Sequence, residues 1–341
     1  MNEVWNLDRI YRTFEDPAFD ADLAQLKALA EEFEAFSQTL GDIAPIDGLR
    51  LGIDFVEKIS ALVNKLGLYA SLRQSVNTRD AEAGSRLGRI MNVVSDTAGP
   101  EAAFKDWAAK VPNLMELVCG DENLKDYEFL FRNMADSAVH FLPGKGEEIM
   151  ARMELSGGNA WSEMQQYLTS TVPVPYNGTV TNLSDIRNLA YDPDPQVRKA
   201  AYEAELACYE RIQDAVAFAL NSIKLETISD CKLRGYESPL DRTLKHSHMK
   251  RETLDAMLGA MDEYLPVFWK YLRAKAKVLG YENGLPWYEL YAPMGKASTR
   301  LTPETTRDYL VEQFSGFDQE LSDMIKRAFD EEWIDFYPRD G

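Results

Sequence analysis

The chain has 341 residues and a formal net charge of −19, because 37 Lys and Arg stand against 56 Asp and Glu. Its 45% of hydrophobic residues is enough for a folded core and excludes general intrinsic disorder. The negative charge repels phosphate backbones and anionic lipids, so neither nucleic acid nor a membrane is an expected partner. Apolar membrane spans and a secretory signal are not visible, and the three cysteines give no disulfide framework, so we expect a soluble cytoplasmic protein.

The first half of the chain has the periodicity of amphipathic helices. Apolar residues recur every three or four positions, which is typical of helices that bury one face. The pattern predicts helices, in chain order, over residues 19–40, 47–77, 80–107, 124–134 and 147–168. Because short links join them, we expect an antiparallel, all-α bundle.

The segment 171–183 breaks this helical pattern. Apolar and polar residues alternate on both sides of Asn177-Gly178, a dipeptide that favours a tight turn. Because Pro173 and Pro175 exclude a central strand, the segment is predicted to be an extended arm or a small edge hairpin. It is also the predicted boundary between an N-terminal helical domain, residues 1–185, and a second helical domain, residues 186–341.

A long helix is predicted next, over residues 194–231. Asp194 suits the N-cap and Pro195 the first helical position, where the missing N–H costs nothing. Gly235 is expected to end the helix, because glycine readily takes the left-handed conformation found at helix C-termini. The apolar face of this helix is rich in alanine, so a partner helix could approach closely.

Two further helices complete the predicted fold. The first covers residues 250–279, with Pro266 predicting a kink near its middle. The second begins at Thr302-Pro303, a favourable helix start. We expect a buried face on this last helix, made by Leu310, Phe314, Phe317, Leu321 and Ile325.

Histidine is scarce, with only His140, His246 and His248 in the chain. No His-Glu-x-x-His pair, Gly-x-Ser-x-Gly elbow or phosphate-binding loop occurs. The imidazoles of His246 and His248 would share a face in an extended segment and could hold a metal, but the flanking lysines favour a polar loop. His140 lies among apolar neighbours, which favours a partly buried, hydrogen-bonded side chain. The residues therefore predict no catalytic residue and no metal ligand in this chain.

Other chemically capable residues have simpler interpretations. Cys208 and Cys231 fall on or near an apolar helix face and are predicted to be small core residues. The acidic clusters at 20–32 and 330–332 are expected to be solvated helix faces. Aromatic side chains could line a peptide channel, although core packing is the favoured interpretation for most of them and no substrate-binding residue is assigned. These aromatics are Trp161, Tyr167, Trp287, Tyr288 and Tyr291.

Several short blocks, taken together, resemble one family of peptidases. The blocks are Glu154-Leu-Ser-Gly-Gly-Asn-Ala-Trp-Ser162, Asp192-Pro-Asp-Pro-Gln-Val-Arg-Lys-Ala-Ala-Tyr202, Ser238-Pro-Leu-Asp-Arg-Thr243, Leu285-Pro-Trp-Tyr-Glu-Leu-Tyr-Ala-Pro-Met-Gly295 and Trp333-Ile-Asp-Phe-Tyr-Pro338. In order and spacing they are similar to the oligoendopeptidase F family of thimet-type zinc metallopeptidases, over nearly the whole chain. Glu289 departs from the family, which more usually has Asp there.

The resemblance implies a mostly helical, two-lobed shell with an internal channel. It further implies a cytoplasmic zinc endopeptidase that hydrolyses short peptides, with zinc bound by His-Glu-x-x-His and a downstream Glu. This chain contains none of those positions, so the resemblance implies the N-terminal portion of such an enzyme, cut before the zinc site. Zinc is expected in the full-length family member and not in this chain.

Two functions remain open from the sequence. The first is a portion of a zinc-dependent endopeptidase, inactive by itself, whose partners are short peptides and the remaining catalytic lobe. The second is a non-enzymatic helical module that binds peptides or other proteins. For the portion of an endopeptidase, apolar faces left without the remaining lobe are expected to cause self-association.

Overall fold

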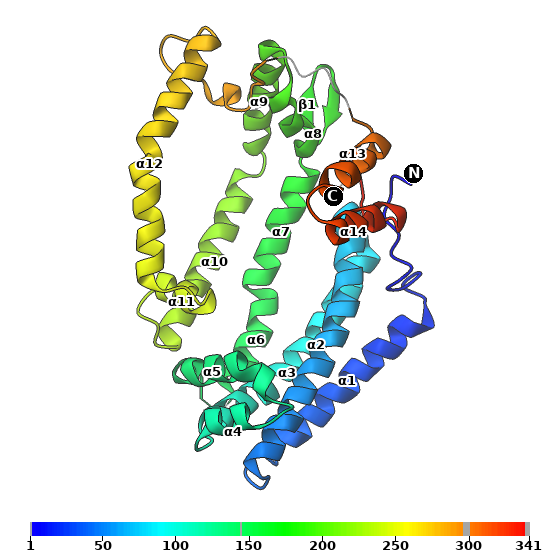
Figure 1. Ribbon diagram of the computed structural model, residues 1–341, viewed down its shortest axis with the longest axis vertical. Helices are drawn as coiled ribbons and strands as arrows, with labels where there is room; N and C mark the ends of the chain where they lie inside the picture. Colours follow the sequence, from blue (N-terminus) through cyan, green and yellow to red (C-terminus); the bar gives the residue numbers. More distant parts are fainter. Residues whose placement is uncertain (1, 144, 296–300, 338–341) are drawn as a thin grey trace. The chain divides into compact units, whose positions relative to one another are not determined.

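The structure, a computed structural model, describes residues 2–143, 145–295 and 301–337. Helices dominate the described residues, and the strands among them form one two-stranded antiparallel sheet (Figure 1). The predicted all-α fold with one small hairpin is therefore confirmed. None of the described helices combines the length and the apolar composition that crossing a bilayer requires.

The chain forms two compact units, which we describe separately. The first unit contains Met1–Pro100 and Gly295–Gly341, and the second contains Glu101–Met294. The helix α3 (Ala81–Ala109) begins in the first unit and ends in the second, with Pro100 inside it. The boundary predicted near residue 185 lies inside the second unit, and the functional division that it implies stays a prediction.

The first unit is built around α1 (Pro17–Ser37) and α2 (Pro45–Val76), which pack against each other as predicted. Asp16 caps α1 by accepting a hydrogen bond from the amide of Ala18, next to a proline at the first helical turn. Four rings pack edge to face at the core, with centroids 5.1–5.5 Å apart in the closest pairs. We call these residues the aromatic cluster: Tyr11, Phe14, Phe19 and Tyr69.

The last predicted helix is in fact two helices, α13 (Pro303–Ser315) and α14 (Gln319–Asp330). Thr302 begins α13 as predicted, and the structure adds a capping box between Thr302 and Thr305. The prediction of one continuous buried face is wrong, because Asp318 caps a new helix by accepting a hydrogen bond from Leu321 N–H. Phe317 lies in this break and is 82% exposed.

The second unit begins with α4 (Leu114–Gly120), η1 (Lys125–Tyr127), α5 (Glu128–Ser137) and η2 (Ala138–His140). The helix predicted over 147–168 is divided at Gly157 into α6 (Gly146–Ser156) and α7 (Gly158–Thr171). The helix α10 approaches closely at this division, where a Cβ on Gly157 or Gly158 would lie 2.9 Å from Oε2 of Glu226. The glycine pair of the 154–162 block therefore makes room for that carboxylate.

The hairpin expected at 171–183 is present as β1 (Val174–Tyr176) and β2 (Thr179–Thr181). Asn177 and Gly178 both have positive φ, 49° and 78°, as a two-residue turn of this type requires. A small core joins the hairpin to α8 (Leu183–Asn188), η3 (Leu189–Tyr191) and α9 (Pro195–Tyr209). The buried members of this core are Val172, Val174, Leu183, Ile186, Ala201, Cys208 and Ile212.

The long helix predicted over 194–231 is also two helices, α9 and α10 (Gln213–Leu233). Asp194 caps α9 as predicted, and Gly235 follows the end of α10 with φ of 72°. The division at residues 210–212 was missed because the apolar period continues through it. Ile212, only 8% exposed, packs into the core beneath the hairpin, and this tertiary contact accompanies the break.

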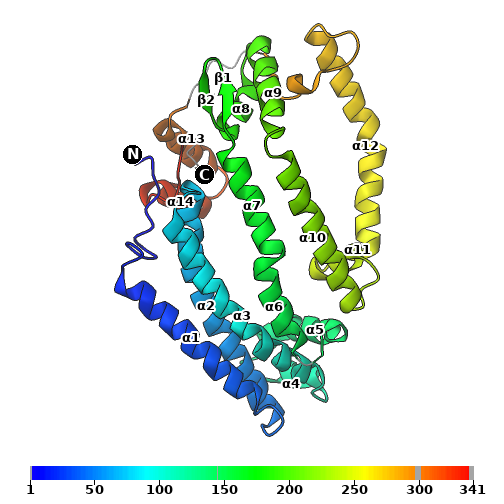
Figure 2. The ribbon, with the colours of Figure 1, turned by 180° about the vertical axis from the view of Figure 1, so that it is seen from behind.

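The remaining elements of the second unit are α11 (Pro239–His246), α12 (Arg251–Val278) and η4 (Trp287–Glu289). Both ribbon views show α7, α10 and α12 following one another across this unit, with α12 outermost (Figures 1 and 2). The helix α12 is continuous through Pro266, and a kink there stays a prediction.

Candidate functional site

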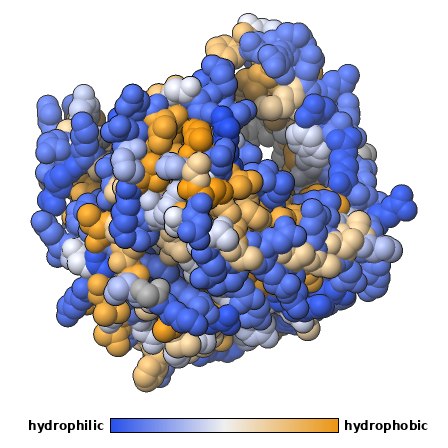
Figure 3. Space-filling view, turned by 90° about the horizontal axis from the view of Figure 1, so that it is seen from below, coloured by the Kyte–Doolittle hydropathy of each residue, from blue (hydrophilic) through white to orange (hydrophobic). Residues whose placement is uncertain are grey.

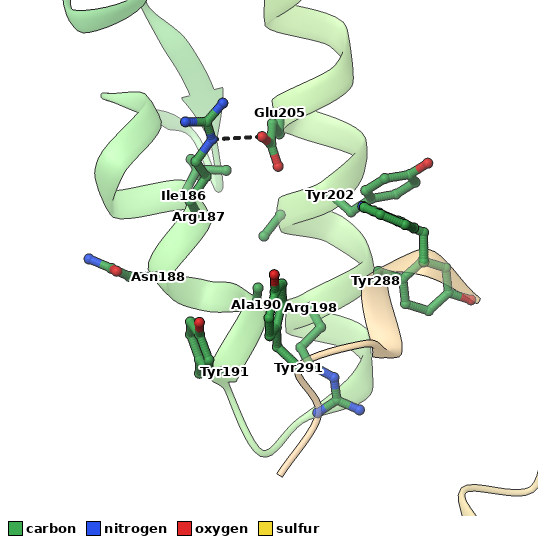
Figure 4. A pocket seen from close by; sticks show the side chains of 12 residues that line it. Ile186, Arg187, Asn188, Ala190, Tyr191, Arg198, Tyr202, Glu205, Tyr288 and Tyr291 are labelled. Atoms are coloured by element: carbon green, nitrogen blue, oxygen red, sulfur yellow. Dashed lines mark hydrogen bonds and ion pairs between the residues drawn. The ribbon is translucent and has the colours of Figure 1, made fainter. Parts of the chain in front are cut away.

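A pocket of about 410 Å³ lies in the second unit, where α8, η3, α9 and η4 meet (Figure 4). Its size falls within the range of small-molecule binding pockets. Side chains from two stretches of sequence that lie about 90 residues apart form its walls. They are Ile186, Arg187, Asn188, Ala190, Tyr191, Arg198, Ala201, Tyr202, Glu205, Trp287, Tyr288 and Tyr291, and we call the space that they line the aromatic pocket.

Aromatic rings on the rim of the pocket are unusually exposed. Trp287 is 70%, Tyr191 61% and Tyr291 54% exposed, so Trp287 and Tyr291 do not have the core-packing role that was expected for most of the five aromatics. The rings of Tyr191 and Tyr291 lie 5.1 Å apart at 38°, and those of Tyr202 and Tyr288 lie 5.8 Å apart at 47°. Each pair joins an element near the hairpin to the segment around η4.

One wall of the pocket carries a charged network. The Nε of Arg187 donates to Oε1 of Glu205 at 2.8 Å (Figure 4). Its Nη2 donates to the Tyr209 hydroxyl. The Tyr209 hydroxyl in turn donates to Glu205. The hydrogen bonds to Glu205 and Tyr209 raise the pKa of Arg187 above its ordinary value. The Glu205 carboxylate is thus paired with one cation, Arg187, and accepts a second hydrogen bond from a neutral hydroxyl.

A buried ion pair fixes the segment that carries the rim rings. Arg198 on α9 and Glu289 on η4 are 3% and 0% exposed in their side chains, and Nη2 of Arg198 donates to Oε2 of Glu289. The Tyr281 hydroxyl donates to the other carboxylate oxygen at 3.0 Å, and burial followed by this bond raises the pKa of Tyr281 to about 12. Nη1 of Arg198 also donates to the backbone carbonyls of Asp192 and Pro193.

Sequence reasoning missed both members of this pair. Arg198 lies in the family-like block 192–202 and Glu289 in the family-like block 285–295. Their places in these blocks were the only sequence feature that could have pointed to the pair. In the sequence, Glu289 stood out only as a departure from the Asp that is more usual in the family. The structure shows that its carboxylate is completely buried and holds η4 against α9.

The histidines occupy three different environments in the second unit. His140 is buried, its Nδ1–H donates to the carbonyl of Arg234, and its ring stacks on that of Tyr236 with centroids 3.8 Å apart. The sequence predicted such a buried, hydrogen-bonded histidine. His246 ends α11, while the ring of His248 lies edge-on to Phe129. His246 thus lies at the end of a helix, and these described residues do not form the extended segment in which the imidazoles of His246 and His248 would share a face.

A zinc site needs three or four convergent ligands. Among the described residues, no three His, Cys, Asp or Glu side chains come together in that way. Cys208 and Cys231 are 1% and 2% exposed and serve as small core residues, and burial raises the pKa of the Cys208 thiol. The described residues do not fit a zinc ion.

The acidic clusters are more structured than the sequence suggested. Asp22 accepts hydrogen bonds from the hydroxyl of Tyr11 and from Lys65, each at 2.6 Å. Near the other cluster, Glu331 pairs with Arg9 at 2.7 Å. Asp22 and Glu331 therefore hold elements of the first unit together, whereas Glu31 and Glu32 are exposed as expected.

Comparison with known proteins supports the resemblance of the motifs. The model of the Oligopeptidase F family matches residues 108–172. An oligoendopeptidase F homolog of Lactococcus lactis is 26% identical over 97% of this chain and 56% of its own length. The oligopeptidase PepF of Bacillus subtilis is 20% identical over 99% of this chain and 51% of its own length.

Solved structures agree on the fold. The oligoendopeptidase F of Enterococcus faecium superimposes with a TM-score of 0.73 at 18% identity, over 93% of this chain and 66% of that one. A PZ peptidase A crystallised with an inhibitor gives 0.72 at 13% identity, over 89% of this chain and 53% of that one. The chain is thus similar to oligoendopeptidase F proteins along nearly its whole length, and it spans about half the length of the curated relatives it matches.

Proposed function

We propose that this chain forms the helical, peptide-holding part of a cytoplasmic zinc-dependent endopeptidase of the oligoendopeptidase F type, which hydrolyses short peptides. The observation that carries the proposal is the match to oligoendopeptidase F relatives along 97–99% of the chain. Because the described residues do not fit zinc, the metal ligands and the catalytic carboxylate would come from another segment or another chain.

Two long helices of the second unit support the idea that a further part completes this structure. Large apolar side chains of α12 are between 40% and 72% exposed, and α10 has several more. Those of α12 include Met257, Leu258, Met261, Tyr264, Leu265, Phe268 and Trp269, and those of α10 include Phe218, Leu225 and Leu233. Figure 3 shows that apolar residues reach the surface in groups on the face that it displays.

Leaving these side chains in water has a large energetic cost. Burying one large apolar side chain contributes about 1.5–3 kcal/mol, and monomeric proteins rarely expose contiguous apolar patches of this kind. We propose that the remaining catalytic lobe covers the faces of α10 and α12, and that self-association covers them when the lobe is absent.

The proposal is tested by measuring zinc and hydrolysis together. The 341-residue chain should hold no stoichiometric zinc and should not cleave an internally quenched peptide, whereas a protein that continues into a His-Glu-x-x-His segment should do both. Elemental analysis that finds about one tightly held zinc per 341-residue chain would contradict this account.

A second candidate function is a non-enzymatic module that binds peptides, and the exposed rings of the aromatic pocket favour it. The gene sequence downstream of the codon for Gly341 distinguishes the two candidate functions. A reading frame that continues into His-Glu-x-x-His supports the enzyme, while a stop codon directly after Gly341 supports the binding module.

A further inference from the structure

We infer that the aromatic pocket is a subsite that accepts a neutral aromatic side chain of a bound peptide. The inference rests on the proposed function, because it assigns a preferred side chain to the peptides that this chain is proposed to hold. It concerns binding by residues of this chain alone, and no zinc chemistry enters it.

The first reason is the exposure of the rings. Trp287, Tyr191 and Tyr291 are each more than half exposed, yet they gather around one cavity. Tryptophan and tyrosine are the residues most often found at the energetic centre of binding sites, because they combine a large rigid surface with a polar atom. Scattered exposed aromatics would need no explanation, but their convergence on a pocket does.

The second reason is the geometry of the two ring pairs. The Tyr191–Tyr291 pair and the Tyr202–Tyr288 pair are tilted at 38° and 47°, with ring centroids 5.1 Å and 5.8 Å apart. Aromatic rings attract one another in such offset and tilted arrangements at centroid separations of about 4.5–7 Å. A further ring that enters the cavity can therefore extend the existing pairs, and a volume of about 410 Å³ leaves room for it.

The third reason is the balance of charge around the cavity. Glu205 is bound by Arg187 and Tyr209, and the buried Arg198 is paired with Glu289. A basic side chain would meet the guanidinium of Arg187, which is 58% exposed. An acidic side chain would have to compete with Glu205 for that same guanidinium. A neutral ring has neither disadvantage.

The fourth reason is that the wall is held in place before any ligand binds. Glu289 lies two residues from both Trp287 and Tyr291, and it is fixed by Arg198 and Tyr281. Lys275 adds a hydrogen bond from Nζ to the carbonyl of Leu290 at 2.8 Å. Preorganisation of this kind reduces the entropy that is lost when a ligand binds.

The test uses the whole 341-residue chain and capped heptapeptides with three glycines on each side of one variable residue. Calorimetry or NMR titration should show that the phenylalanine peptide binds at least about tenfold more tightly than the lysine and aspartate peptides. The variants Tyr291→Ala and Trp287→Ala should each weaken that binding about tenfold, while Tyr291→Phe should retain it. Tyr167→Ala is the matched control, because Tyr167 is 49% exposed on α7 and does not line the pocket.

If the lysine peptide binds more tightly than the phenylalanine peptide, the inference is overturned and the pocket is a cation-binding cage. Equal binding of all three peptides would also overturn the inference, because the pocket would then have no preference. Unchanged affinity in both alanine variants, with circular dichroism like that of the wild type, would also overturn it. If none of the three peptides binds, the subsite inference is wrong. The peptidase proposal would still stand, because zinc content and the downstream reading frame test it separately.

Discussion

Helices α2 and α12 are both long, 32 and 28 residues, and both carry apolar side chains at helical spacing. In α2 that stripe is buried, with Leu49, Leu66 and Tyr69 at 1% exposure or less. In α12 the residues that are buried are Lys275 and Ala276, near its end, while Phe268 on the apolar stripe is 60% exposed. The same pattern of sequence therefore gives a covered face in one unit and an uncovered face in the other.

The difference lies in what each helix finds to pack against. α2 packs on α1 and contributes Tyr69 to the aromatic cluster, so its apolar face closes a core inside the first unit. In the described second unit, the apolar stripe of α12 has no comparable cover. Amphipathic spacing thus predicts that a face needs a cover, and does not say which part of a protein supplies it.

The largest contrast should come from removing one phenylalanine in each unit. Phe33→Ala in the first unit should cost about 3–5 kcal/mol of unfolding free energy, because Phe33 is 1% exposed and stacks on Phe55. Phe268→Ala on α12 should change stability by no more than about 0.5 kcal/mol and should reduce self-association. Urea titrations followed by circular dichroism measure both. Equal losses in the two variants would contradict the comparison.

Breaking the buried Arg198–Glu289 ion pair beside the aromatic pocket should strongly lower the unfolding free energy, which would show that this part of the second unit is tightly packed. Arg198→Ala leaves the Glu289 carboxylate buried without its partner, which costs about 3–5 kcal/mol. The control is Arg251→Ala, since Arg251 is 61% exposed and pairs with Asp255 in an i,i+4 arrangement worth about 0.3–0.5 kcal/mol. Chemical denaturation checks both values, and a small loss in Arg198→Ala would show that η4 is held by other contacts.

The two glycines between α6 and α7 offer a finer test of packing against α10. A Cβ on Gly157 would lie 3.0 Å from the backbone carbonyl of Met153, whereas the close contacts of a Cβ on Gly158 are with the flexible carboxylate of Glu226. Gly157→Ala should therefore cost about 1–3 kcal/mol, and Gly158→Ala should stay within about 1 kcal/mol of the wild type. Thermal unfolding of the two variants provides the measurement, and the reverse order would show that the carboxylate cannot move.

The smallest expected effect is a pH dependence centred on Glu147 in the second unit. Burial acts to raise its pKa, but hydrogen bonds from Arg234 and from the Leu142 amide outweigh it and hold the pKa below the ordinary value of 4.5. A carboxyl group with a lowered pKa stabilises the fold above its unfolded pKa, and this contribution is lost as pH falls through the folded pKa.

Stability measured from pH 6 downward should therefore fall less steeply in Glu147→Gln than in the wild type, with the difference confined to the range below about pH 4.5. Because Gln keeps the shape of the side chain without its titration, it isolates the carboxyl group. Parallel curves for the two proteins would show that Glu147 titrates alike in the folded and unfolded states.

The sequence predicted the helices well because periodicity and capping are local. Asp194, Gly235 and Thr302 act at the helix ends where their side chains or backbone preferences suggested. Breaks inside the predicted helices were missed. Gly157 offered a weak signal, but the division before α10 depends on how Ile212 packs with residues from distant segments.

The candidate site was harder to predict than the helices. The residues of the aromatic pocket were visible as family-like blocks, but their meeting depends on contacts between segments about 90 residues apart. Core packing was the expected role for most of the five candidate aromatics, and the sequence could not show that Trp287 and Tyr291 are exposed, because composition does not reveal whether an aromatic side chain is covered. The burial of Glu289 likewise follows from tertiary structure alone.

The central claim, that α2 is covered within this chain and α12 is not, is tested most directly by hydrogen–deuterium exchange with mass spectrometry. At a dilution where the chain sediments as a monomer, amides in the middle of α12 should exchange at least about a hundredfold faster than those in the middle of α2, because an uncovered helix opens locally at low cost. Equal protection of the two helices would contradict the claim.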